Sequence, residues 1–134
     1  MALRYMLDSD TCIVVMQRRS PQLLQRLDRL APVCAMSVVV YGELCFGEAT
    51  STRQSEVAAY RAALIEMIQV LPLPMEAAAE YATVRATLGR AGKPIGQNDL
   101  WIAAHALAEN LTLVTNNERE FRRVPRLRVE NWAR

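Results

Sequence analysis

Short apolar strands alternate with helices along the chain, and this alternation limits the choice of fold more than any other feature. The predicted strands are residues 4–7, 33–36, 69–71 and 111–115, with 128–130 as a possible edge strand. Cap and turn residues bound the helical stretches between them. Such alternation is typical of an α/β/α sandwich around a mostly parallel central sheet of four or five short strands.

The predicted helices fill the intervals between the strands. They cover residues 12–16, 21–30, the stretch after Ser37 that contains Val40, Leu44 and Phe46, and then 53–68, 75–90, 97–109 and 117–121. Neither a repeat nor a low-complexity linker interrupts the pattern. A chain of 134 residues has the length of one ordinary domain, so a single domain over residues 1–134 is predicted.

The composition is typical of a compact globular protein, since 51% of the residues are hydrophobic and 22% are charged. The longest nearly apolar run covers residues 33–42 and ends at Glu43, which is shorter than the roughly 20 residues of a membrane helix. The N-terminal residues show no secretory pattern. We therefore expect a cytoplasmic protein without membrane contact.

The cysteines and the histidine do not suggest a zinc or disulfide chemistry. Cys12, Cys34 and Cys45 form no CxxC pair and lie within apolar segments, so buried free thiols are expected. His105 is the one histidine, and it is expected to be a helix-face residue rather than a ligand. Any metal site must then rely on oxygen ligands, which favour a hard cation.

Polar clusters follow two of the predicted strands. Residues 8–10 read Asp-Ser-Asp after the first strand, and residues 116–118 read Asn-Asn-Glu after the strand 111–115. Ligands of open α/β sheets bind beyond the carboxyl ends of the strands. Helix capping is an equally ordinary role for these residue types. Asp8 stands out, because Asp10 or Thr11 is available to cap the helix in its place.

Two further carboxylates lie on apolar helix stripes. Glu43 lies between Val39 and Phe46 on its helix, and Asp99 lies one turn before Ile102. A carboxylate in such a place needs a partner or a cation, although Asp99 also fits a first-turn acid that complements the helix dipole. Acids that converge on one site raise one another's pKa, and Mg²⁺ relieves this repulsion. Such a site supports in-line attack of a metal-activated water on a phosphodiester.

Four stretches resemble the motifs of VapC-type PIN-domain ribonucleases, in the order and spacing of that family. They are YMLDSDT at 5–11, SVVVYGEL at 37–44, PIGQND at 94–99 followed by IAAHA at 102–106, and TNNEREF at 115–121. Together they span nearly the whole chain. The similarity is greatest to the enteric VapC toxins, whose helix also follows a Gly-x-Pro-Ile-Gly loop.

The resemblance implies that Asp8, Glu43 and Asp99 hold Mg²⁺ or Mn²⁺, with Asp8 and Asp99 as the principal ligands. This chain departs from the family at two positions. Asp10 replaces a frequent asparagine, and Asn117 stands where many members have an acid. Glu120, one helical turn further on, is the expected substitute, whereas Asn117 is expected to hydrogen-bond a water molecule on the metal.

The resemblance also implies partners and a biological role. VapC proteins are toxins of type II toxin–antitoxin pairs, held inactive by a VapB antitoxin whose C-terminal segment covers the active-site groove. Toxin and antitoxin bind promoter DNA through the antitoxin, and the toxins usually form homodimers. Their substrates are structured RNAs, which in the enteric group include initiator tRNA. The arginines near the C-terminus are expected to hold the RNA backbone; they are Arg119, Arg122, Arg123, Arg126 and Arg128.

Two other functions fit parts of the sequence. Residues 7–11 partly resemble the Asp-x-Asp opening of haloacid-dehalogenase-like phosphatases, but those enzymes also need a lysine and a later acidic pair. Lys93 is the one lysine, and no such pair follows it. The second alternative is a catalytically degenerate PIN-fold protein that acts by binding antitoxin or RNA, and Asn117 is the feature that favours it.

Overall fold

The protein folds around a five-stranded parallel sheet with the strand order β3-β2-β1-β4-β5. The computed structural model describes residues 2–133. The strands are β1 (Tyr5–Leu7), β2 (Cys34–Ser37), β3 (Gln69–Leu71), β4 (Thr112–Val114) and β5 (Val129–Glu130). The predicted fold class is therefore confirmed, including the fifth strand at the edge.

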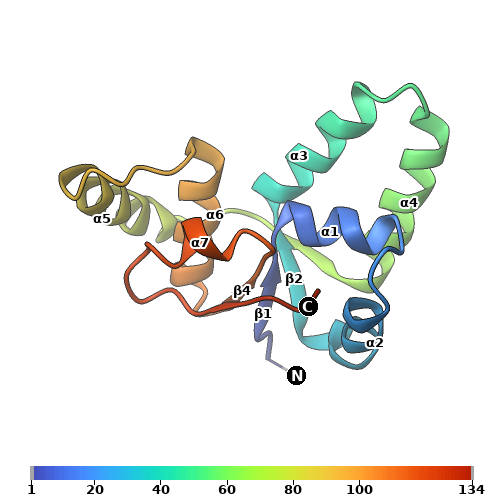
Figure 1. Ribbon diagram of the computed structural model, residues 1–134, viewed down its shortest axis with the longest axis horizontal. Coiled ribbons are helices and arrows are strands. Elements are labelled where there is room, and N and C mark those ends of the chain that lie inside the picture. The colour runs from blue at the N-terminus through green and yellow to red at the C-terminus, as the bar shows by residue number, and fades with distance from the viewer. Residues whose placement is uncertain (1, 134) are drawn as a thin grey trace.

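Helices cover both faces of the sheet. They are α1 (Ser9–Met16), α2 (Pro21–Leu30), the short 3₁₀ helix η1 (Ala31–Val33), α3 (Val38–Ala49), α4 (Gln54–Met67), α5 (Ala77–Arg90), α6 (Gln97–Ala108) and α7 (Glu118–Phe121). Figure 1 shows α1 to α4 on one side of the strands and α5 and α6 on the other. The sequence placed these elements within about three residues of their observed ends.

The three central strands are buried along their whole length. Every residue of β1, β2 and β4 is buried, which is the pattern of parallel strands covered by helices on both faces. Met6, Met36 and Leu113 are 0% exposed at the centre of this core. Burial of such side chains contributes about 1.5–3 kcal/mol each, so the sheet is a rigid support for the residues at its ends.

Capping residues fix where the helices begin. Ser20 accepts a hydrogen bond from the Leu23 amide at the start of α2, where Pro21 occupies the first helical position. Ser37 closes β2 and at once caps α3 by accepting from the Val39 amide. Because strand and helix meet without a loop, the position of Ser37 determines where α3 leaves the sheet.

Successive strands are added first on one side of β1 and then on the other. The chain first moves outward through β2 and β3, and then returns to place β4 on the other side of β1. The register pairs Leu7 with Val114, and the Asp8 amide donates to the Val114 carbonyl over 2.9 Å. The carboxyl ends of β1 and β4 therefore lie side by side at a topological switch point, where open α/β sheets bind ligands.

The hairpin of α3 and α4 stands away from the sheet (Figure 1). Only Val40 and Leu44 are buried on α3, and only Leu64 is buried on α4, whereas Phe46 is 70% exposed. Among residues 2–133, none of the helices combines the length and apolar character needed to cross a bilayer.

The remaining aromatic and cysteine side chains have structural surroundings. Trp101 of α6 stacks on Tyr81 of α5 with ring centroids 3.9 Å apart, and Trp132 packs edge-on against Tyr5. Both tryptophans therefore pack against a neighbouring tyrosine ring. Cys12 and Cys34 are buried free thiols as predicted, while Cys45 is free and only partly buried.

Candidate active site

Asp8 lies at the junction of β1 and α1, with 4% of its surface exposed. Its Oδ1 accepts from the Ser9 amide at 2.8 Å, and its Oδ2 accepts from the Thr115 hydroxyl at 2.7 Å. Asp8 is thus itself the N-cap of α1. The expectation that Asp10 or Thr11 would cap this helix was wrong, because α1 begins directly after the strand and leaves Asp8 at the cap position.

Asp10 and Thr115 belong to the same cluster. Asp10 Oδ1 accepts from the Asn116 amide at 3.3 Å, and the Thr115 hydroxyl lies 3.4 Å from the same oxygen. Thr115 also accepts from the Asn117 amide at 2.9 Å. The Thr115 hydroxyl, directly after β4, therefore links Asp8 and Asp10 to the loop that leads into α7.

Glu43 approaches the cluster from α3. Its Oε2 lies 3.4 Å from Asn98 Nδ2 on α6. Its Oε1 is buried and has no hydrogen-bond partner among the described residues. An unpartnered buried carboxylate oxygen costs free energy, so this atom is one to which a cation or a donor group would bind favourably.

Asp99 is half-buried in the first turn of α6, near the residues of α7. Asn117 Nδ2 donates to Glu120 Oε2, and the charge of Glu120 is the strongest electrostatic influence on Asp99. Asn117 therefore fixes the carboxylate of Glu120, whose charge acts on Asp99, and the role of Glu120 as a substitute acid stays a prediction.

The electrostatics show that these acids lie within reach of one another's charge. Burial raises the pKa of Asp8 to about 7, with a further increase from the charge of Asp10 and a smaller one from Asp99. Burial likewise raises the pKa of Asp99 to about 6, and Glu120, Glu43 and Asp10 add to this increase. Carboxyl groups whose pKa is raised by burial and by neighbouring negative charge are common at functional sites.

The carboxylates converge, yet they do not form a finished set of ligands. Among residues 2–133, no three His, Cys, Asp or Glu side chains are placed so that they could hold one metal ion. Like charges repel, and three of the acids accept hydrogen bonds from the chain: Asp8 from Thr115, Glu43 from Asn98 and Glu120 from Asn117. The available donors are all oxygens, which suits Mg²⁺ or Mn²⁺ and not zinc.

A family model agrees with this arrangement. The model described as "PIN domain" matches residues 5–127, from the first residue of β1 to the segment before β5. The chain belongs to the PIN-domain family.

Relatives of this PIN domain match it over nearly its whole length. "Ribonuclease VapC2" of Haemophilus influenzae is 38% identical over 131 residues, which are 98% of this chain and 99% of the relative. The "tRNA(fMet)-specific endonuclease VapC" of Salmonella typhimurium is 34% identical over 131 residues, with the same coverage. The solved structure of VapBC2 from Rickettsia felis, bound to a DNA fragment from its promoter, superposes with a TM-score of 0.91 at 34% identity, covering 98% of this chain and 99% of the other.

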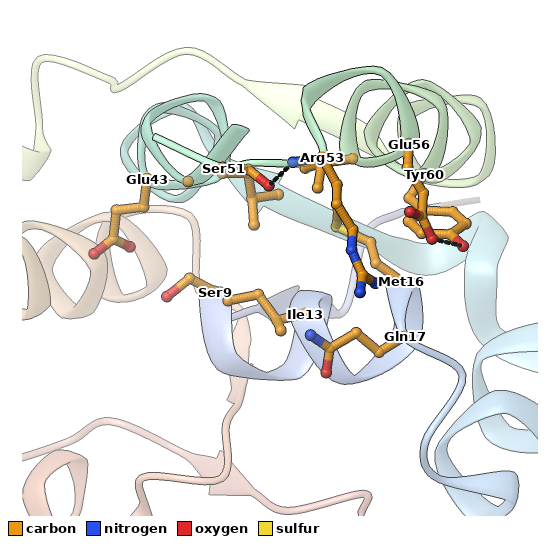
Figure 2. Close-up of a pocket in the computed structure, with 12 residues that line it drawn as sticks. Ser9, Ile13, Met16, Gln17, Glu43, Ser51, Arg53, Glu56 and Tyr60 are labelled. Carbon is orange, nitrogen blue, oxygen red and sulfur yellow. Dashed lines mark hydrogen bonds between the residues drawn. The ribbon is translucent and has the colours of Figure 1, made fainter. Parts of the chain in front are cut away.

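A groove of about 690 Å³ opens beside the acids of the PIN domain, between α1 and the α3–α4 hairpin. Figure 2 shows Glu43 at one end of this groove and Tyr60 at the other, with the Arg53 side chain directed into it. Ile13 and Met16 supply apolar surface from α1. Asp8 and Asp99 are not among its lining residues, so Glu43 is the acid that connects the groove with the cluster.

The role of the C-terminal arginines in holding RNA stays a prediction, and several of these arginines have partners within the chain. Arg122 pairs with Glu118 and Arg126 pairs with Glu80. Arg128 bonds Asn110 and Thr112 next to the amino ends of β4 and β5. Because the strands are parallel, Arg128 lies at the opposite edge of the sheet from Asp8.

Two members of the cluster, Asp10 and Thr115, were not identified as site residues from the sequence, and neither was Asn98. Asp10 had been assigned to capping, and Thr115 to the end of a strand. The signal that was available is the pairing of β1 with β4, which places an Asp-x-Asp segment directly opposite a polar segment that begins with threonine.

Proposed function

We propose that this PIN domain is the toxin of a type II toxin–antitoxin pair and cleaves RNA as a divalent-metal-dependent endoribonuclease. The observation that carries the proposal is full-length similarity to VapC ribonucleases in a chain whose acids gather at the carboxyl edge of the sheet. Substrate RNA and antitoxin are both macromolecules of the cytoplasm, so we place the activity there. Transfer RNA is the first candidate substrate, because one relative is a tRNA(fMet)-specific endonuclease.

Asp8, Asp99 and Glu43 are the residues that would hold Mg²⁺ or Mn²⁺. The unpartnered Oε1 of Glu43 and the raised pKa values of Asp8 and Asp99, caused by burial and by neighbouring acids, support this choice. When bound, the cation supplies the positive charge that lowers the pKa of a water nucleophile and stabilises the phosphodiester transition state.

The other residues of the cluster position these acids. Thr115 donates to Asp8 Oδ2 and the Ser9 amide holds Oδ1, so this carboxylate has one fixed orientation. Asn98 makes a long, weak contact with one oxygen of Glu43. Asn117 directs Glu120 toward Asp99, and this arrangement favours a working site over a degenerate one in spite of the asparagine.

We propose that the antitoxin's C-terminal segment lies in the groove between α1 and the α3–α4 hairpin. The apolar side chains of Ile13, Met16 and Leu44 favour a protein segment, and Glu43 at one end places that segment beside the acids. An occupant of this groove would exclude RNA from the carboxylates. Promoter DNA would be bound through the antitoxin; the VapBC2 complex of Rickettsia felis is itself bound to a fragment of its promoter.

The test is RNA cleavage by the purified chain. Total tRNA is incubated with the wild-type protein in Mg²⁺ or Mn²⁺, and in EDTA. Cleavage is expected with either metal and not with EDTA, and both Asp8→Asn and Asp99→Asn are expected to abolish it. The matched control is Asp28→Asn, an exposed acid of α2 outside the site, which should cleave at the wild-type rate. Cleavage at the wild-type rate by both Asp8→Asn and Asp99→Asn would refute the proposal.

A further inference from the structure

A buried imidazole–hydroxyl pair lies behind the carboxylates and takes no part in the mechanism above. His105 of α6 is 0% exposed, and its Nδ1 lies 2.8 Å from the Oγ of Ser37, which is also 0% exposed. The sequence predicted a helix-face position for His105, and the structure places it in the core.

The pair connects the two helices that carry Glu43 and Asp99. Ser37 caps α3, and Glu43 lies six positions further along that helix. His105 belongs to α6, and Asp99 lies six positions before it. Six residues of helix span about 9 Å, so a shift at the pair moves both carboxylates through short, stiff lengths of backbone.

Other polar contacts between these two segments are weak. The side-chain bond from Asn98 to Glu43 is 3.4 Å long and exposed to solvent, and bonds of this length contribute little. Among the described residues, the His105–Ser37 bond is the buried side-chain hydrogen bond that links α6 to the start of α3.

This pair is not an efficient way to stabilise a core. Burial lowers the pKa of His105 to about 4, so the ring is neutral at pH 7. Its Nε2 is buried without a hydrogen-bond partner among the described residues. A buried polar atom without a partner is costly, and an apolar side chain of similar shape is often as stable or more so. The directional bond to Ser37 is what a leucine at this position would not provide.

We propose that His105 and Ser37 are positioning residues, which hold α3 and α6 in the register that lets Glu43 and Asp99 share one divalent cation. The inference rests on the proposed metal-dependent function. Mg²⁺ requires near-octahedral geometry at about 2.0–2.1 Å, and ligands must be held within about 0.5 Å of their working positions. A hydrogen bond between the N-cap of α3 and the last turn of α6 meets that requirement.

The test compares variants that keep or remove the bond to Ser37. In His105→Asn the side-chain amide replaces Nδ1 and keeps the bond, whereas His105→Leu removes it. Ile102→Val is the matched control, because it loosens the same buried helix face without touching the pair; Ile102 is 0% exposed. Mn²⁺ affinity is measured by calorimetry for all three variants and the wild type. The backbone amide signals of Val39 and Glu43 are compared by NMR in the metal-free proteins.

The leucine variant is expected to bind Mn²⁺ about tenfold more weakly and to shift both amide signals. The asparagine and Ile102→Val variants should stay within about threefold of the wild type. Wild-type affinity in the leucine variant, or equal losses in His105→Leu and Ile102→Val, would overturn the inference. If His105→Leu does not fold, Ser37→Ala and Ser37→Thr provide the same comparison, with the loss expected only in the alanine variant.

Failure of the proposed function is distinguishable from failure of this inference. Absence of Mn²⁺ binding by the wild-type protein would refute the metal-dependent function. The amide signals then still decide the positioning claim, because unchanged Val39 and Glu43 signals in His105→Leu would refute it in the absence of any metal.

Discussion

Replacement of Asp8 by asparagine is expected to stabilise the metal-free protein at alkaline pH. Burial and the charge of Asp10 raise the pKa of Asp8 from 3.8 to about 7. Because each pKa unit corresponds to about 1.4 kcal/mol, the ionised carboxylate destabilises the folded state by about 4 kcal/mol at pH 8. Asparagine removes this charge and is also a good N-cap.

The net gain in stability of Asp8→Asn is smaller than about 4 kcal/mol, because the substitution weakens the charge-assisted hydrogen bond from Thr115. We expect about 2 kcal/mol in the free energy of unfolding, or roughly 6 °C in Tm for a chain of this length. The pH dependence has a definite sign. Between pH 4 and 7 the folded Asp8 binds more protons than the unfolded one, so wild-type stability from this group is greatest below pH 4 and is lost as the pH rises.

The assay is thermal or urea unfolding in EDTA at pH 4.5 and pH 8, for the wild type, Asp8→Asn and the exposed control Asp28→Asn. The difference between Asp8→Asn and wild type should be small at pH 4.5 and largest at pH 8, while the control stays within about 0.5 kcal/mol throughout. An Asp8→Asn variant that is less stable than wild type at pH 8, or a gain that is equal at both pH values, would refute the electrostatic reasoning.

Three further results are expected. Mn²⁺ should raise the Tm of the wild type at pH 8. The affinity of the protein for Mn²⁺ should fall as the pH approaches 6, where Asp99 binds protons. An affinity that calorimetry finds independent of pH would contradict this. Asn117→Asp removes the donor to Glu120 and should lower metal-free stability by about 1 kcal/mol, with Mn²⁺ recovering the loss; urea unfolding with and without Mn²⁺ measures both. Val57→Asp in the groove should weaken antitoxin binding at least tenfold in calorimetry and leave RNA cleavage intact, whereas Met75→Asp, 89% exposed and outside the groove, should change neither.

Local signals in the sequence were sufficient to predict most of the fold. Pro21 and Ser37 marked helix starts that the structure reproduces. The alternation of strands and helices required a parallel sheet, since parallel strands need crossover connections. The order of the strands is a tertiary property, and the sequence reasoning gave no order. The extent of the domain, residues 1–134, stays a prediction.

The site was predicted less completely than the fold. Asp8, Glu43 and Asp99 stood out because carboxylates at strand ends and on apolar stripes need a partner. Their roles as metal ligands stay a proposal. The role of Asp10 in the cluster depends on its contacts with Thr115 and Asn116, which lie about a hundred positions further along the chain. No local sequence pattern predicts such contacts. The position of Arg128 was not foreseen for the same reason: it directly precedes β5 and lies at the opposite end of the parallel strands from Asp8.

The most direct measurement is a calorimetric titration of the metal-free wild-type protein and of Asp99→Asn with Mn²⁺ at pH 8. The account predicts saturable binding by the wild type and at least tenfold weaker binding by the variant, because Asp99 would join Asp8 and Glu43, from two other segments of the chain, around one cation. Equal affinities, or no binding by the wild type at millimolar Mn²⁺, would contradict the claim that these acids form a metal site.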